Sequence, residues 1–152
     1  MKSLMRNKQW FIVQTALLLL ILFSPFRIEL HLSLSMRYLG LLFFAIGMCP
    51  AIYATLSLRE NLKPSPKPRA GGYLVTSGLY RIVRHPTYAG ILLAASGISL
   101  WMSDLLRAKL TLVLFILLDA KTRIEEKWLE KMYSEYVAYK KQVTKEFFPL
   151  VF

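Results

Sequence analysis

The chain has 152 residues, of which 55% are hydrophobic, and it carries a formal net charge of +11. A water-soluble domain with this much apolar material would leave large apolar patches exposed, whereas a single membrane domain places apolar residues in spans with Lys and Arg beside them. The only cysteine, Cys49, excludes an intramolecular disulfide, no Cys/His spacing predicts a metal site, and basic residues that flank apolar runs do not form a nucleic-acid-binding region.

Three apolar stretches within the first 103 residues are expected to form transmembrane helices. The first covers residues 9–26, and no small-residue cleavage site follows it, which favours a retained helix over a signal peptide. The second covers residues 38–58 and contains Pro50, which is expected to kink it. The third covers residues 86–103, and its small residues are of the kind that let helices approach closely in lipid.

A fourth span over residues 105–119 has a weaker pattern, because its uncharged part is short. It can cross only if Arg107 and Lys109 extend toward the opposite surface. We expect one long helix from Leu105 to about Val143, whose later part is amphipathic and lies in the cytosol or at the membrane surface. Trp128 and the tyrosines of that part are expected to pack onto the membrane surface.

The basic residues indicate an orientation for these spans. Sixteen Lys and Arg lie before the first span, between the second and third, or after the fourth, and only four lie on the other side. The positive-inside rule then places both termini and the polar segments in the cytoplasm. The sequence therefore predicts an all-α fold: a single domain over residues 1–152, with about four transmembrane helices and a cytosolic C-terminal amphipathic helix.

The loop before the third span has features of a ligand site. Three glycines within eight residues allow its backbone to lie close against a ligand. Pro86 suits the first position of the third helix, which places His85 where free N–H groups and the helix dipole favour an anion. By itself this pattern is also typical of a helix that simply begins at the membrane surface.

Two longer motifs resemble one enzyme family. The run LVTSGLYRIVRHPTYAGILL at residues 74–93 resembles the signature of the isoprenylcysteine carboxyl methyltransferase family and of related membrane phospholipid methyltransferase-like proteins. The run EEKWLEKMYSEYVAYKKQV at residues 125–143 resembles the second signature of that family, with a Glu-Glu pair followed by a leucine and spaced tyrosines. The resemblance covers about half the chain, residues 70–150, with the two motifs in the family's order.

The resemblance implies that S-adenosylmethionine binds in a membrane-embedded pocket closed by residues 70–90 and 121–150. A carboxylate beside this cofactor is physically sensible, because the methyl donor carries an ammonium and a sulfonium. The cofactor contacts implied by position are Gly72, Tyr73, Leu74, Val75, Tyr80, Arg84, His85, Pro86, Thr87, Tyr88 and Glu125.

Lys121, Arg123 and Glu126 are the candidate catalytic residues. The family's substrate-facing arginine stands four residues before the Glu pair, where this chain has Lys121, and an arginine follows at Arg123. On a helix Lys121 shares a face with Glu125, whereas Arg123 points elsewhere, and lysine lacks arginine's bidentate fork. Glu126 or a tyrosine is a candidate base for a nucleophile that must lose a proton. Both glutamates could instead be solvated residues that balance nearby basic side chains.

The resulting hypothesis is carboxyl O-methylation of an isoprenylcysteine-like or other lipid-like acid. The alternative within the same class is N- or S-methylation of a phospholipid amine or a small thiol. A non-enzymatic exporter or scaffold is disfavoured, because no Asp or Glu lies centrally in an expected span. The expected partners are a lipid-like or prenylated substrate and membrane lipids, with neither nucleic acid nor metal.

Overall fold

The computed structural model describes residues 2–61 and 71–148, and within them the fold is all-helical, as predicted. An isolated antiparallel bridge between Glu29 and Asp104 is the nearest approach to a strand in this part of the chain. The helices are α1 (Lys2–Phe23), α2 (Leu34–Leu58), α3 (Pro86–Trp101), α4 (Leu105–Met132) and α5 (Tyr136–Gln142), with 3-10 turns η1 (Arg59–Asn61) and η2 (Gly78–Arg81).

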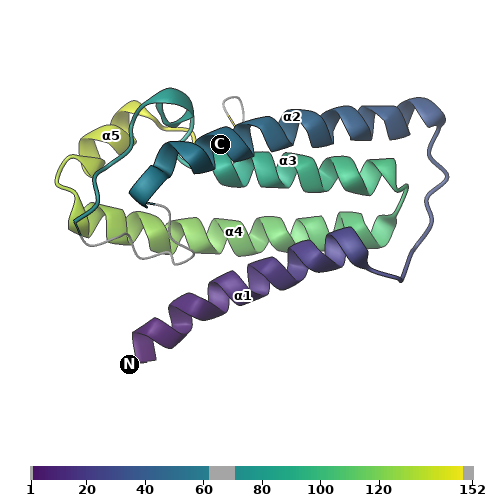
Figure 1. Ribbon diagram of the computed structural model, residues 1–152, viewed down its shortest axis with the longest axis horizontal. Coiled ribbons are helices and arrows are strands. Elements are labelled where there is room, and N and C mark those ends of the chain that lie inside the picture. Colours follow the sequence, from purple (N-terminus) through teal and green to yellow (C-terminus); the bar gives the residue numbers. More distant parts are fainter. Residues whose placement is uncertain (1, 62–70, 149–152) are drawn as a thin grey trace.

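The four long helices form a bundle in which successive helices run in opposite directions (Figure 1). α3 packs between α2 and α4, and α1 lies along the outer side of α4. The start of α3, the end of α4 and the whole of α5 gather at one end of the bundle, together with η2. This arrangement brings both motif-bearing segments to the same end.

Glycines allow α2 and α3 to pack at close range. Gly40 on α2 faces Gly97 on α3, and Gly47 faces Gly90. The two glycines of each helix are seven residues apart in sequence, so they lie on one face of that helix. A Cβ atom at Gly47 would lie 2.5 Å from the backbone nitrogen of Ala94. The close approach expected from the small residues of the third span is therefore found, and Gly90 and Gly97 supply it.

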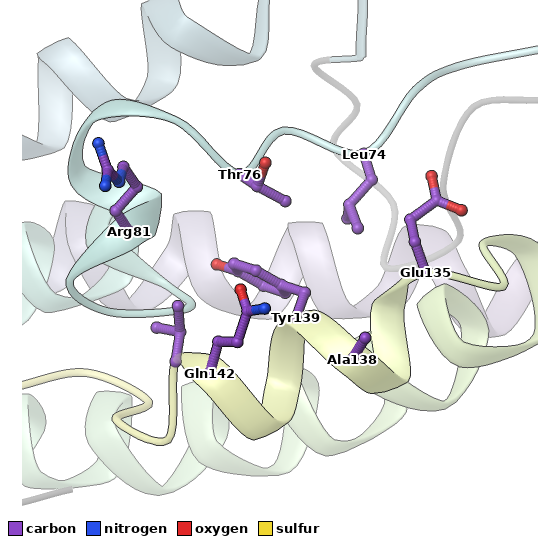
Figure 2. Close-up of a pocket in the computed structure, with 8 residues that line it drawn as sticks. Leu74, Thr76, Arg81, Glu135, Ala138, Tyr139 and Gln142 are labelled. Carbon is purple, nitrogen blue, oxygen red and sulfur yellow. The ribbon is translucent and has the colours of Figure 1, made fainter.

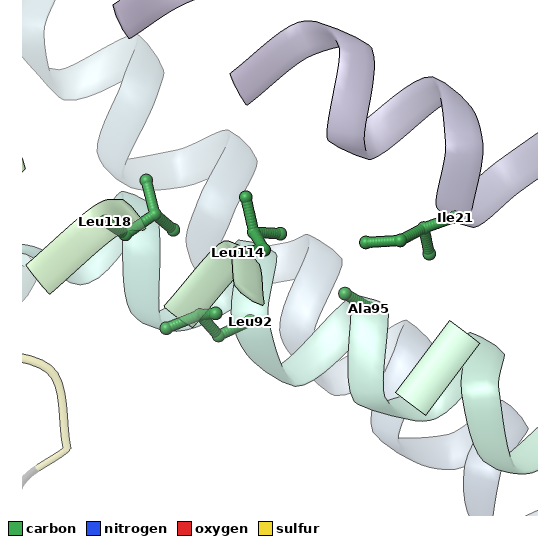
Figure 3. Close-up of a cluster of buried hydrophobic side chains, with 5 residues drawn as sticks. All are labelled: Ile21, Leu92, Ala95, Leu114 and Leu118. Atoms are coloured by element: carbon green, nitrogen blue, oxygen red, sulfur yellow. The ribbon is translucent and has the colours of Figure 1, made fainter. Parts of the chain in front are cut away.

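An apolar cluster joins α1 and α3 to α4 (Figure 3). Dispersion contacts of this kind are small individually, but they add up over a fully buried cluster. The buried members are Ile21, Leu92, Ala95, Leu114 and Leu118.

Arg107 has a different role from the one expected. Instead of extending to a surface, its side chain is buried, with 2% exposure, and forms an ion pair with Asp104. Its Nε donates to the carbonyl of Ile21 at 2.9 Å, and a terminal nitrogen donates to that of Ser24 at 3.0 Å. These carbonyls have no partner within α1, so Arg107 caps the end of that helix. Lys109 is exposed, as a side chain that extends away from the protein would be.

The expected single helix from Leu105 to Val143 is also wrong, because α4 ends at Met132. Tyr133 takes an extended conformation, with φ −122° and ψ 112°, and α5 begins three residues later. The break lets α5 fold back, so that Tyr136 and Tyr139 are buried in the protein rather than packed onto a membrane surface. They lie against Leu74, half-buried Tyr133 and the remaining members of a second cluster.

Only part of the expected membrane topology is found. Among the described helices, α2 alone is long and apolar enough to cross a membrane by length and composition, and Gln9–Phe23 forms a shorter apolar helix. Large apolar side chains are nevertheless exposed on three helices, which is typical of a surface that meets lipid. Examples are Phe11, Ile12 and Leu19 on α1, Leu42, Ile46 and Leu56 on α2, and Leu112, Val113 and Ile116 on α4.

We predict that Gly47→Ala destabilises the fold. Alanine in an exposed helix position is favoured over glycine by about 1 kcal/mol, but here the new methyl group would meet the α3 backbone, which cannot move aside cheaply. The midpoint of thermal unfolding in detergent should therefore fall. Ala45→Val, on the exposed face of the same helix, is the control and should change the midpoint little. An equal or higher midpoint for Gly47→Ala would contradict the close α2–α3 contact.

Candidate functional site

Three segments that are distant in sequence meet at the polar end of the bundle. The backbone N–H groups of Arg84 and His85, just before α3, donate to the carbonyls of Lys145 and Glu146, both at 2.9 Å. The side chain of Glu146 in turn accepts a hydrogen bond from Thr122 on α4 at 2.5 Å. The start of α3, the end of α4 and the segment after α5 are therefore held together by hydrogen bonds.

Glu126 is the centre of a buried charge cluster. One of its carboxylate oxygens accepts from Arg84 Nε at 2.6 Å and lies 3.4 Å from His85 Nε2, and the other lies 2.7 Å from Lys140 Nζ. Arg84 also donates to the carbonyls of Val143 and Thr144, at 3.0 and 2.6 Å. The fork geometry of arginine thus ties α4 to the segment that follows α5.

The environment of Glu126 keeps it ionised. Burial alone would raise the pKa of its carboxyl, but hydrogen bonds from His85, Lys140 and Arg84 hold that pKa well below its usual value. A carboxylate this weakly basic is poorly suited to accept a proton from an amine or thiol. Glu126 is only 6% exposed, so the alternative that it is a solvated residue is wrong.

A second group of side chains surrounds the ring of Tyr88 on α3. Its hydroxyl donates to Glu125 Oε2 at 3.0 Å, and the imidazole of His85 stacks on the ring with centroids 5.7 Å apart. Lys121 Nζ lies 4.9 Å from the ring centroid and donates to Gln14 Oε1 on α1 at 2.7 Å. Lys121 and Glu125 therefore share one helix face, as their spacing predicts.

Lys121 is a buried cation, only 4% exposed. Burial lowers the pKa of its ammonium, although the nearby charge of Glu125 acts in the opposite direction. Arg123 is placed quite differently: its side chain is 71% exposed and pairs with Asp119 at 3.0 Å, one turn earlier on α4. Of the two basic candidates, only Lys121 faces the Tyr88 group.

The first part of the predicted cofactor segment is hydrogen-bonded to other parts of the fold. Tyr80 is buried and bridges two helices: its hydroxyl donates to the carbonyl of Ala54 on α2 at 3.3 Å, and its carbonyl accepts from the Tyr139 hydroxyl on α5 at 2.6 Å. Burial raises the pKa of Tyr80 to about 12. The backbone of Tyr73 pairs with the side chain of Asn61, while its own side chain is exposed. Gly72, Leu74 and Val75 are half-buried.

An open groove of about 540 Å³ lies between residues 74–81 and α5 (Figure 2). It contains one predicted cofactor residue, Leu74, but neither His85 nor Glu125, so it is separate from the Tyr88 group. Its lining residues are Leu74, Thr76, Arg81, Glu135, Ala138, Tyr139, Gln142 and Val143.

Several residues of the polar end do not follow from the motifs. Gln14 is a polar side chain within the first apolar stretch, and this placement is the sequence signal for it. Lys140 and Glu146 belong to a strongly charged C-terminal region in which no spacing distinguishes them. Only the fold back at Tyr133 brings them to Glu126 and Thr122.

A metal ion is not needed to explain the acidic residues here. Possible ligand atoms of His85, Glu126 and Glu146 lie within 4.8 Å of one another. However, Arg84 and Lys140 already neutralise Glu126, and Glu146 accepts the Thr122 hydrogen bond. The cluster is thus satisfied by the chain's own cations and hydroxyl group.

The Tyr88 group fits the charges of S-adenosylmethionine, the cofactor that the motifs imply. Glu125 is a half-buried carboxylate fixed by a tyrosine hydroxyl, which suits an ammonium or sulfonium. One buried polar atom at the start of α3, Thr87 Oγ1, has no hydrogen-bond partner within the described residues. Buried polar groups are normally satisfied, so this hydroxyl is available to a polar ligand beside Pro86.

A search of protein families matches residues 35–136 to a family described as phospholipid methyltransferase. The match covers about two thirds of the chain, from the start of α2 to the first residue of α5, and leaves out α1. No curated protein matches the chain.

We predict that Glu126→Gln lowers the free energy of unfolding by about 3 kcal/mol at pH 7, because it leaves buried Arg84 without its charged partner. The folded pKa of Glu126 lies below its unfolded value of about 4.3. Its charge therefore stabilises the fold fully above about pH 5, and this contribution is lost as the pH falls toward the folded pKa. The difference between wild type and variant should shrink over that range.

Denaturant titrations in detergent at several pH values measure this difference. Glu130→Gln is a matched control, because Glu130 also pairs with Lys140 but is exposed, and it should cost less than about 1 kcal/mol. Similar losses for the two variants would contradict the central role of Glu126.

Proposed function

The chain belongs to the phospholipid methyltransferase family, and from this membership we propose that it transfers a methyl group from S-adenosylmethionine to a lipid-like acceptor. Membership makes the chain a membrane methyltransferase in general terms. The proposal adds the cofactor, the class of acceptor and the place of reaction, which is the Tyr88 group at the polar end of the bundle. It also retains the expected topology of about four spans, with this end facing the cytoplasm.

The observation that carries the proposal is the pair of opposite charges beside Tyr88. Glu125 is bound to the tyrosine hydroxyl, while Lys121 lies at the ring and is nearly inaccessible. Charges held in a site of low dielectric constant act more strongly than charges in water. The anionic side suits a cationic methyl donor, and the cationic side suits an acceptor that carries an anionic oxygen.

When bound, S-adenosylmethionine supplies a methyl carbon on a sulfonium, and transfer to a carboxylate breaks one C–S bond, forms one C–O bond and cancels both charges without moving a proton. The residues of the chain then have to bind, align and exclude water. Glu125 and the Thr87 hydroxyl would orient the donor. Phe147 is buried against His85, with ring centroids 6.3 Å apart, so the C-terminal segment shields this side of the site.

Carboxyl O-methylation is the reaction that these side chains support best. Lys121 would hold the acceptor carboxylate as a point charge, and a carboxylate needs no base. This agrees with Glu126, the expected base, being bound by Arg84 and Lys140 and unsuited to accept a proton. An isoprenylcysteine-like acid is one member of this acceptor class.

N-methylation of a phospholipid amine is the second candidate. The family description, phospholipid methyltransferase, favours it. Lys121 could bind the phosphate of a phospholipid in the same way as a carboxylate. An amine nucleophile must lose a proton, and Glu125 is then the carboxylate closest to the reaction.

Calorimetric titration with S-adenosylmethionine in detergent tests the cofactor proposal. We expect Glu125→Gln to weaken binding by about tenfold or more, corresponding to 1.4 kcal/mol or more, because it removes a charge-assisted contact. Glu29→Gln, an exposed glutamate at the other end of the bundle, is the control and should bind normally. Wild-type protein that is folded and binds no S-adenosylmethionine would overturn the proposal.

A labelled-methyl assay on lipid extracts tests the acceptor. Ester products release labelled methanol on base hydrolysis, whereas N-methyl products keep the label, so O-methylation predicts base-labile label. Lys121→Met should raise the acceptor KM about tenfold or more, because it removes the buried cation. Lys127→Met, an exposed lysine on the same helix, is the control. Base-stable label would favour the phospholipid amine instead.

A further inference from the structure

α1 lies outside the segment that matches the family, yet it reaches the proposed site through one side chain. α1 and α4 pack in opposite directions, and Ile21 and Leu114 belong to the same core cluster. Gln14 lies seven residues before Ile21, and Lys121 lies seven residues after Leu114. Two helical turns along each chain therefore bring Gln14 and Lys121 together, with Oε1 and Nζ 2.7 Å apart.

The contacts of Lys121 with Gln14 and Tyr88 limit its orientation without neutralising its charge. An ammonium has three N–H donors, of which one points to the Gln14 amide oxygen. The face of the Tyr88 ring, 4.9 Å away, restricts Nζ from the side of α3. Both groups are neutral, in contrast to the Glu126 carboxylate, which forms ion pairs with Arg84 and Lys140. Of these three cations, Lys121 is the one held mainly by neutral groups, with Glu125 as its nearby charge.

We propose that Gln14 is a positioning residue of the acceptor site. It holds the Lys121 ammonium against Tyr88, so that a remaining N–H is directed to an anionic oxygen of the acceptor, either a carboxylate or a phosphate. The inference rests on the proposed function and adds to it: α1 becomes part of the acceptor site. Gln14 acts only through Lys121 and does not touch the acceptor.

Two substitutions at this position separate positioning from packing. Gln14→Leu keeps the size of the side chain but removes the acceptor of the Lys121 hydrogen bond. Gln14→Glu keeps that hydrogen bond and the packing but adds a charge that neutralises Lys121. We expect both to raise the acceptor KM about five- to tenfold while the KM for S-adenosylmethionine stays constant. If Gln14 only packed α1 against α4, Gln14→Glu would leave the acceptor KM at the wild-type value.

A double-mutant cycle tests whether Gln14 acts through Lys121. In a Lys121→Met background there is no ammonium to orient, so Gln14→Leu should cause no further rise in the acceptor KM. Gln9→Leu, the same change at an exposed position of α1, is the matched control and should have no effect in either background. Additive effects of Gln14→Leu and Lys121→Met would overturn the proposal.

A second readout needs no methyl transfer. In protein carrying ¹⁵N-labelled lysine, the Nζ resonance of Lys121 can be identified by its loss in Lys121→Met. Gln14→Leu should shift this resonance and speed the exchange of its protons with solvent, while Gln9→Leu should leave it unchanged. An unshifted resonance in Gln14→Leu would overturn the positioning role. If Gln14→Leu shifts the resonance but the wild-type protein binds no S-adenosylmethionine, the contact between Gln14 and Lys121 is supported and only the proposed function is overturned.

Discussion

The ion pairs of one buried carboxylate, that of Glu126, hold together the segments that form the polar end of the bundle. Arg84 reaches it from the start of α3, and Lys140 reaches it from α5. A buried carboxylate is costly unless its charge is compensated, so these segments cannot separate without leaving charges unpaired. The same arginine binds carbonyls of the C-terminal segment, whose Phe147 covers His85. The position of the Tyr88 group therefore depends on this cluster.

Two adjacent glutamates on α4 have different environments because neighbouring helix positions face different partners. Glu126 points to two cations and stays ionised as part of the framework. Glu125 accepts only a tyrosine hydroxyl among its described hydrogen bonds, so its charge is available to a cationic ligand. Lys121, one turn earlier on the face of Glu125, donates to Gln14 and lies at the Tyr88 ring, and neither of these groups carries a charge that neutralises it. One helix thus separates the framework charges from those that we propose bind ligands.

The packing of the bundle positions these groups along the helix axes. The glycines of α2 and α3 let the two backbones approach closely, and this contact fixes the register of α3. At the opposite end of the bundle, Arg107 binds the last carbonyls of α1 and thereby fixes the register of α1 on α4. Because helices are stiff, fixing one end determines which residues meet at the other. Gln14 and Lys121 meet for this reason.

The sequence by itself determined the helical class, the apolar stretches, the two motifs and the shared face of Lys121 and Glu125, because all of these depend on local composition and helical periodicity. It did not determine that Arg107 is buried, that the chain breaks at Tyr133, or that Glu126 rather than Glu125 is neutralised. Those outcomes depend on partners that are distant in the chain: Ile21 for Arg107, Leu74 for the tyrosines of α5, and Arg84 and Lys140 for Glu126. Only tertiary packing brings such partners together, because periodicity gives the direction of a side chain and not what it meets.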